Sequence, residues 1–127
     1  MEKINLNHIK KAIEVFERFR KNLNSDQEKA GAVQAFEFCY ELSWKIMKRL
    51  LEMRGLEVGS PKDTIRKAFE EQLIPDPEIW FEFQKRRNLT THTYNEGNLD
   101  IIVQVFDRFS QELQNLIINI ERINNAT

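Results

Sequence analysis

The sequence has few of the residues that hold together disulfide-bonded, metal-binding or turn-rich domains. Its 127 residues include one cysteine, two histidines, three prolines and four glycines. Cys39 therefore has no partner for an internal disulfide, and no set of residues has the spacing of zinc ligands. We interpret Cys39 as a packing residue and expect no metal site and no cofactor.

Long hydrophobic runs and an excess of one charge are also missing. No apolar stretch approaches the roughly 20 residues that span a bilayer, and the first residues lack the hydrophobic core of a secretion signal. We therefore expect a cytoplasmic protein without membrane contact. Lys and Arg together number 19 against 20 Asp and Glu, a net charge of -1. Because this balance gives no overall attraction to nucleic acid, any contact with phosphate must be local.

Apolar residues recur at helical spacing along nearly the whole chain, and no segment alternates with the period of a strand. At 41% hydrophobic residues, the chain is long enough to bury one core. We predict a single domain over residues 1–127, an all-α antiparallel helical bundle of four main helices and a short one. The residues expected to face the core from the first helix are Ile9, Ile13, Phe16, Phe19 and Leu23.

The second helix is the longest that the sequence predicts, and it has apolar residues on two faces. Ser25 and Glu28 form a capping box and Gly55 suits a left-handed C-cap, so we estimate that this helix covers residues 26–54. A helix with two apolar faces is usually covered twice, by its own chain or by another subunit, which predicts a homodimer. The two stripes are Val33, Phe36, Tyr40, Trp44 and Met47, and Phe38, Leu42, Ile46 and Leu50.

Prolines at the first helical position mark the next two helices. Pro61 and Pro77 each follow a residue that caps helices, and they begin a third helix, to about residue 72, and a fourth. From about Asn95 onward, apolar residues repeat at steps of three and four. This pattern predicts one unbroken last helix.

The side chains best suited to chemistry lie between the fourth and last helices, where Arg87, His92 and Tyr94 occur together. On an unbroken helix Arg87 and His92 would be about 140° apart, so a helix must end between them if they act together. We expect His92 at the N-terminus of the last helix. Backbone amides there, with a nearby guanidinium, favour an anion such as phosphate.

A neutral histidine beside a phosphate can remove the proton of a ribose 2′-hydroxyl or protonate the leaving oxygen, while Arg87 stabilises the developing charge. Ordinary roles remain open: Arg87 and His92 can cap carbonyls, meet a surface carboxylate or stabilise a subunit interface. Glu37 and Glu41 are a second candidate site, as paired acid/base carboxylates, but Glu41 and Lys45 also have the spacing of an ion pair. The residues to which we assign supporting roles at the Arg87 site are Asn88, Glu41 and Thr91.

The interval Arg87-x4-His92-x-Tyr94 resembles the signature of HEPN domains of the HepT type. Residues 36–45 and 91–95 resemble a branch described as nucleotidyltransferase substrate-binding proteins. The resemblance extends from the first predicted helix to the last. It implies an antiparallel helical bundle that forms a homodimer, with the motifs of both subunits facing one cleft.

The same resemblance implies a toxin of a two-component toxin–antitoxin system. Arg87 and His92 would be catalytic residues of a metal-independent endoribonuclease with RNA as its substrate. A companion minimal nucleotidyltransferase would restrain it by adenylylating Tyr94. A second function stays open, in which the bundle is a non-catalytic subunit that binds substrate or docks the nucleotidyltransferase. Because docking does not require His92 beside Arg87, we favour RNA cleavage.

Overall fold

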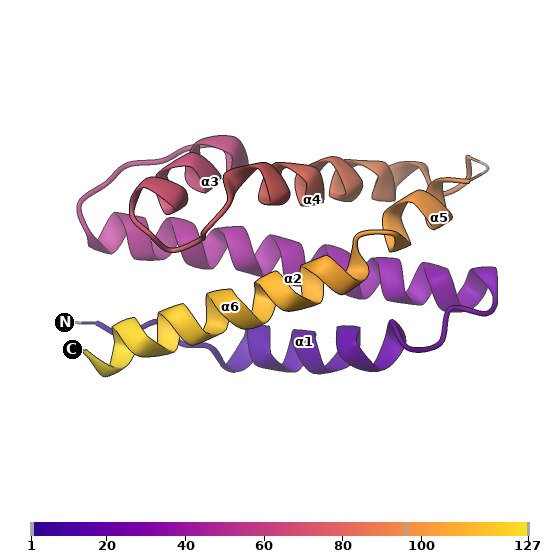
Figure 1. Cartoon of the computed structure of the whole chain (residues 1–127), viewed down its shortest axis with the longest axis horizontal. Coiled ribbons are helices and arrows are strands. Elements are labelled where there is room, and N and C mark those ends of the chain that lie inside the picture. The colour runs from indigo at the N-terminus through magenta and orange to yellow at the C-terminus, as the bar shows by residue number, and fades with distance from the viewer. Residues whose placement is uncertain (1, 96, 127) are drawn as a thin grey trace.

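The computed structural model describes residues 2–95 and 97–126, and every regular element within these ranges is helical (Figure 1). The expected all-α class is therefore confirmed. The elements in chain order are α1 (Asn7–Phe19), α2 (Asp26–Met53), α3 (Pro61–Glu70), α4 (Pro77–Leu89), the 3-10 turn η1 (Thr90–His92), α5 (Asn98–Val103) and α6 (Phe106–Asn125).

The long α2 is the axis of the bundle. In Figure 1, α1 runs antiparallel along one side of α2, and α4 runs antiparallel along the other side. α6 crosses the front of α2 on its way back to the end that holds both termini, and α3 packs against α2 at that end. The turn between α4 and α5 lies at the opposite end, so the segment with Arg87 and His92 faces the first half of α2.

Buried aromatic rings join the helices at the centre. Phe109 of α6 lies 4.7 Å from Phe36 of α2, 5.4 Å from Phe16 of α1 and 4.9 Å from Phe83 of α4, measured between ring centroids. All three pairs meet edge to face, which places the positive ring edge against the negative face of its neighbour. One ring thus connects four helices, and it fixes α4 relative to α2.

Capping residues set the starts of α2, α3 and α4 as expected. The side chains of Ser25, Ser60 and Asp76 each accept a hydrogen bond from an amide in the first turn of the helix that follows. The capping box of α2 is completed differently, because the carboxylate of Glu28 accepts from the amide of Asn24 at 3.0 Å and not from that of Ser25. The estimate of residues 26–54 for α2 is one residue too long.

The third helix ends earlier than the expected residue 72. Gln72 has a left-handed φ of 64°, and the amide of Leu73 donates to the carbonyl of Ala68 at 2.8 Å. This is the Schellman arrangement, which usually places glycine where Gln72 stands. The sequence signal for the helix end was therefore absent, because a glutamine occupies the position.

The last segment is two helices, so the expectation of one unbroken helix from Asn95 is wrong. Arg86 of α4 donates from Nη1 to the carbonyl of Ile101, at 2.5 Å. In a continuous helix that carbonyl would accept from the amide of Val105, which instead donates to Ile102. A side chain from another helix thus terminates α5, and the chain turns before α6 begins.

Several residues expected in the core lie nearer the surface. Ile9 and Phe16 of α1 are fully buried, but Phe19 is 38% exposed. In the second stripe of α2, Leu50 is buried whereas Phe38 is 59% exposed. Within the described ranges, no helix is both long enough and apolar enough to cross a membrane.

Candidate functional site

Arg87 lies in the last turn of α4, and the helix ends two residues later at Leu89. The hydroxyl of Thr90 lies 2.7 Å from the carbonyl of Arg87, and the chain continues as the 3-10 turn η1. A threonine hydroxyl that bonds back to a carbonyl of the preceding turn competes with helical hydrogen bonding. The expected helix end between Arg87 and His92 is thereby confirmed.

The guanidinium of Arg87 points at α2 and binds two carboxylates there. Its Nε lies 2.8 Å from Glu41 Oε1, and its Nη1 lies 3.4 Å from Glu37 Oε2. Glu37 and Glu41 are one helical turn apart, so both reach the same side chain. The Arg87 side chain is 26% exposed. Part of the guanidinium therefore meets solvent while the rest is held by α2.

Each carboxylate has a second partner that fixes its position. Trp44 donates from Nε1 to Glu41 Oε2 at 3.0 Å, and the hydroxyl of Thr90 lies 2.6 Å from Glu37 Oε2. The Glu41–Lys45 ion pair that the spacing suggested is absent from the described structure, because Glu41 binds Arg87 instead. Glu41 thus accepts a hydrogen bond from Arg87 and Glu37 forms an ion pair with it, which is a structural role for both glutamates.

Tyr40 lies beside this cluster but is sealed from solvent. Its side chain is buried, and its hydroxyl has no hydrogen-bond partner within the described part of the chain. Burial raises the pKa of the Tyr40 phenol, the negative charge of Glu41 adds to that rise, and Arg87 opposes it. Tyr40 is therefore a neutral core residue and takes no part in acid/base chemistry.

His92, the last residue of η1, forms a pair with Tyr94 in the turn that follows. His92 Nδ1 lies 3.0 Å from the Tyr94 hydroxyl, and the rings meet edge to face at 5.7 Å. The turn is held by the carbonyl of His92, which accepts from Asn98 Nδ2 at 2.7 Å and from the amide of Asn95 at 3.1 Å. Both rings are exposed, and Tyr94 is 78% exposed.

The expectation that His92 begins the last helix is wrong. α5 begins at Asn98, after Gly97 with its left-handed φ of 87°. The free amides of that helix start therefore belong to residues beyond the turn, and they do not flank His92. Arg87 and His92 also make no direct contact in the described structure: Arg87 faces α2, and His92 contacts Tyr94.

Of the three supporting residues named from the sequence, one contacts Arg87 and two lie exposed on the surface. Glu41 holds Arg87 directly. Thr91 and Asn88 are exposed, and they contact each other through the Thr91 hydroxyl and the Asn88 carbonyl at 3.2 Å. Sequence reasoning missed Thr90, which connects Arg87 to Glu37, and Asn98, which holds the His92 carbonyl. Neither residue has a sequence signal apart from its nearness to the motif, because the contacts depend on how the turn folds.

The electrostatics of the site are mixed. Every hydrogen bond that Arg87 makes within the described ranges uses Nε or Nη1, so its Nη2 is available to an external anion. The two glutamates together carry more negative charge than Arg87 neutralises. A phosphate that approaches Arg87 therefore also meets carboxylate repulsion, and its binding should be weak and sensitive to salt. No group of three or more His, Cys, Asp or Glu side chains within the described ranges is arranged to hold a metal ion.

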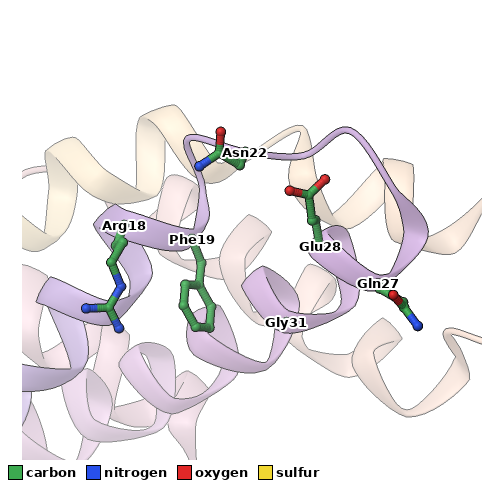
Figure 2. A pocket seen from close by; sticks show the side chains of 6 residues that line it. All are labelled: Arg18, Phe19, Asn22, Gln27, Glu28 and Gly31. Atoms are coloured by element: carbon green, nitrogen blue, oxygen red, sulfur yellow. The ribbon is translucent and has the colours of Figure 1, made fainter.

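A separate concavity lies where α1 turns into α2. Figure 2 shows the ring of Phe19 directed toward Gly31 of α2, with Arg18 beside it and Glu28 across the opening. A Cβ built on Gly31 would lie 3.7 Å from the Phe19 ring, so the glycine gives the ring room to pack against α2. The guanidinium of Arg18 lies 5.5 Å from the ring centroid. These contacts account for the partly exposed Phe19 and do not identify a ligand.

Comparison with known proteins gives one family match over most of the chain. The sequence profile of a family described as nucleotidyltransferase substrate binding protein like matches residues 4–122. A Haemophilus influenzae strain Rd protein named probable ribonuclease HepT is 39% identical over 85 residues. That alignment covers 63% of this chain and 58% of the relative, which is less than two thirds of the relative's length.

Two solved structures share the fold. A protein from Thermus thermophilus superimposes with a TM-score of 0.81 and 29% identity, over 88% of this chain and 98% of its own. A Haemophilus influenzae protein, described as having the fold of a substrate binding domain of a nucleotidyltransferase, gives a TM-score of 0.81 and 30% identity. The second match covers 92% of this chain and 99% of the other. The family and the bundle inferred from the sequence are thus confirmed.

Proposed function

The chain belongs to the family of nucleotidyltransferase substrate binding protein like proteins, and from that premise we propose that it is an RNA-cleaving partner of a nucleotidyltransferase. The observation that carries the proposal is the exposed His92–Tyr94 pair, in which His92 follows Arg87 by five residues. His92 Nδ1 contacts the Tyr94 hydroxyl at 3.0 Å, and the exposed ring leaves Nε2 open to a substrate. An exposed imidazole that a hydrogen bond holds in place suits acid/base cleavage of a phosphodiester, and a partly exposed guanidinium on the same segment can bind the phosphate.

The cleavage chemistry needs only this chain's side chains. Nε2 of His92 takes the proton of a ribose 2′-hydroxyl, and the resulting oxygen attacks the adjacent phosphorus. The bond from phosphorus to the 5′-oxygen breaks, the 5′-oxygen takes a proton from the imidazolium, and a cyclic phosphate remains on the other product. Nη2 of Arg87 stabilises the negative charge that develops on the phosphate oxygens. The hydrogen bond to Tyr94 orients the imidazole during these steps.

The working form in this proposal is a homodimer. Arg87 is turned toward α2 while His92 faces solvent, so a second copy across the turn supplies the other wall of a cleft. Phe38 is 59% exposed and follows Glu37 directly on α2. It lines an apolar groove between α1 and α2 together with His8, Ala12, Val15, Ala35 and Leu42. Burying that stripe between two copies gives the second apolar face of α2 a partner.

The partner nucleotidyltransferase has a regulatory role in this proposal, as the antitoxin to a toxin. Tyr94 is its adenylylation target, because the phenol is 78% exposed on the turn that holds His92. AMP attached there places a bulky anion beside the imidazole. The anion blocks RNA and competes for Arg87, which silences cleavage.

One observation favours a different function. Glu37 and Glu41 already neutralise Arg87, which reduces the attraction of this site for RNA phosphate. A non-catalytic subunit that binds substrate or docks the nucleotidyltransferase needs no free cation. In that case the His92–Tyr94 pair is part of a docking surface.

The deciding experiment is cleavage of a labelled RNA in EDTA, which disables contaminating metal-dependent nucleases. Wild type, His92→Ala and a control with an exposed change on α6, Gln114→Ala, are compared at matched dimer content. Cleavage by wild type and the control but not by His92→Ala supports the nuclease. Equal cleavage by all three, or none, with Tyr94 shown by mass spectrometry to be unmodified, supports the docking subunit.

A further inference from the structure

We infer that His92 is also the general base that activates the Tyr94 hydroxyl for nucleotidyl transfer onto this chain. The inference rests on the proposed partnership with a nucleotidyltransferase and adds a role for the acceptor chain itself. The transferred group would come from a nucleoside triphosphate bound by the partner. This chain would then supply both the nucleophile and the base.

The geometry for proton transfer is present before any partner binds. His92 Nδ1 lies 3.0 Å from the Tyr94 hydroxyl, which is within the reach that a general base requires. A neutral phenol is a weak nucleophile, and an adjacent base that removes its proton as it attacks activates it. In the tautomer with the proton on Nε2, Nδ1 is the acceptor and Tyr94 is the donor.

The pairing is specific to these two residues. The chain has two tyrosines and two histidines. Tyr40 is buried without a hydrogen-bond partner in the described structure, and burial raises the pKa of its phenol. Tyr94 combines exposure, a base and a turn whose backbone is fixed. Of the two phenols, only Tyr94 is presented to a large external substrate with a proton acceptor attached.

The turn supports both partners of the pair. Asn98 Nδ2 and the amide of Asn95 both donate to the His92 carbonyl, at 2.7 Å and 3.1 Å. These bonds hold the backbone from which His92 and Tyr94 extend. Because residues two positions apart point to different sides of a helix, the end of η1 and the turn after it allow the imidazole to meet the phenol.

The reaction balances without any further reactant. The Tyr94 oxygen attacks the α-phosphorus of the nucleoside triphosphate, and its proton moves to His92 Nδ1. The bond between the α-phosphorus and the bridging oxygen to the β-phosphorus breaks, and pyrophosphate leaves. His92 then returns the proton to solvent. The phenol becomes an aryl phosphodiester that no longer donates a hydrogen bond to Nδ1.

This assignment gives the modification a built-in selectivity. The same imidazole would serve RNA cleavage through Nε2 and the silencing step through Nδ1. A chain that can cleave would therefore be a chain that can be modified. A chain without His92 would be slow in both reactions.

The test uses adenosine 5′-phosphorimidazolide, an activated AMP donor that needs no partner enzyme, and peptide mapping by mass spectrometry. Adducts on imidazole are removed by mild acid, so that only the Tyr94 ester is counted. Wild type, His92→Gln and Tyr94→Phe are compared from pH 5.5 to 9, with Gln114→Ala as the control, since Gln114 is exposed on α6. Circular dichroism checks that each variant is folded.

We expect wild type and Gln114→Ala to form the Tyr94 adduct at least tenfold faster than His92→Gln at pH 7.5. The difference between wild type and His92→Gln should shrink toward pH 9, because hydroxide can then remove the phenol proton in both. Tyr94→Phe should form no aryl adduct.

An equal rate and pH profile in wild type and His92→Gln would overturn the inference, as would a folded wild type without a Tyr94 adduct. RNA cleavage in EDTA, measured on the same samples, separates this result from the fate of the nuclease. Loss of cleavage in His92→Gln with unchanged modification would remove the base role and leave the nuclease. If His92 is needed for modification but the wild type does not cleave RNA, the base role would stand and the nuclease would be excluded.

Discussion

Arg87 Nε lies 2.8 Å from Glu41 Oε1, across 46 positions of sequence, and this contact joins the end of α4 to the middle of α2. The orientation of the guanidinium is therefore set by a different helix from the one that carries it. The contact with Glu41 thus orients the Arg87 side chain before any substrate binds. The consequence is that α2 has a part in the site although none of its residues lies in the Arg87 to Tyr94 segment.

Arg87→Lys should lower RNA cleavage at least tenfold, which corresponds to about 1.4 kcal/mol of transition-state stabilisation. An ammonium keeps the charge, but it lacks the planar fork that binds Glu41 and a phosphate at once. Glu41→Gln should have a smaller effect, because the amide oxygen still accepts from Nε. Cleavage rates in EDTA measure both effects.

The control is Arg49→Lys, because Arg49 is an exposed arginine that pairs with Glu2, and this variant should behave as wild type. Unchanged cleavage by Arg87→Lys would remove Arg87 from the site.

Asn98→Ala should reduce cleavage without a large loss of stability. The Asn98 side chain makes the shorter of the two hydrogen bonds to the His92 carbonyl. Its removal therefore loosens the turn and displaces the imidazole. One such hydrogen bond contributes about 1 kcal/mol to stability, which thermal melts would register as a small shift. Asn115→Ala, an exposed change on α6, is the control. Full activity in Asn98→Ala would show that His92 does not depend on this contact.

Phe38→Lys should convert the proposed dimer to a monomer while the helical content stays the same. The ring is 59% exposed in one chain, so a lysine costs little there, but a cation would have to be buried between two copies. Light scattering coupled to size-exclusion chromatography measures the mass. The matched control is Phe69→Lys, because Phe69 is also exposed, at 46%, and lies on α3 outside the groove. A Phe38→Lys dimer would place the interface elsewhere.

Gly31→Ala should raise the free energy of unfolding by about 1 kcal/mol, because alanine favours the interior of a helix more than glycine does. The new methyl group would meet the Phe19 ring at 3.7 Å, an ordinary contact. Gly55→Ala should do the opposite, since Gly55 has a φ of 82° that strains any L side chain. Urea unfolding with an unchanged m-value checks both signs. Destabilisation by Gly31→Ala would mean that the Phe19 ring cannot adjust.

The stability of wild type should fall from pH 9 upward, partly because of Cys39. Burial raises the pKa of its thiol from 9.0 to about 12, and Glu17 adds to the shift. Between these values the unfolded chain loses the thiol proton and the folded chain keeps it, so unfolding becomes easier as pH rises. Cys39→Ala should show a shallower decline between pH 9 and 10 in urea titrations. Parallel curves for the two proteins would contradict the burial of the thiol.

Local rules were enough to locate most helices. A hydroxyl or carboxylate cap forms its bonds within one turn, so Ser25, Ser60 and Asp76 marked three helix starts correctly. They failed where a distant group intervened. Arg86 donates a hydrogen bond to the carbonyl of Ile101, and the last segment is thereby divided into α5 and α6. The sequence around Ile101 does not indicate that a donor from α4 lies there.

The sequence by itself determined the all-α class, the family and the candidate residues Arg87, His92 and Tyr94, because helical periodicity, caps and motif intervals are properties of neighbouring residues. Only the tertiary structure decided what those residues touch. It turned Arg87 toward Glu37 and Glu41, and it placed His92 on a turn with Tyr94 in place of a helix start. The physical reason is that a side chain's partner depends on how whole helices pack, and the aromatic core around Phe109 sets that packing.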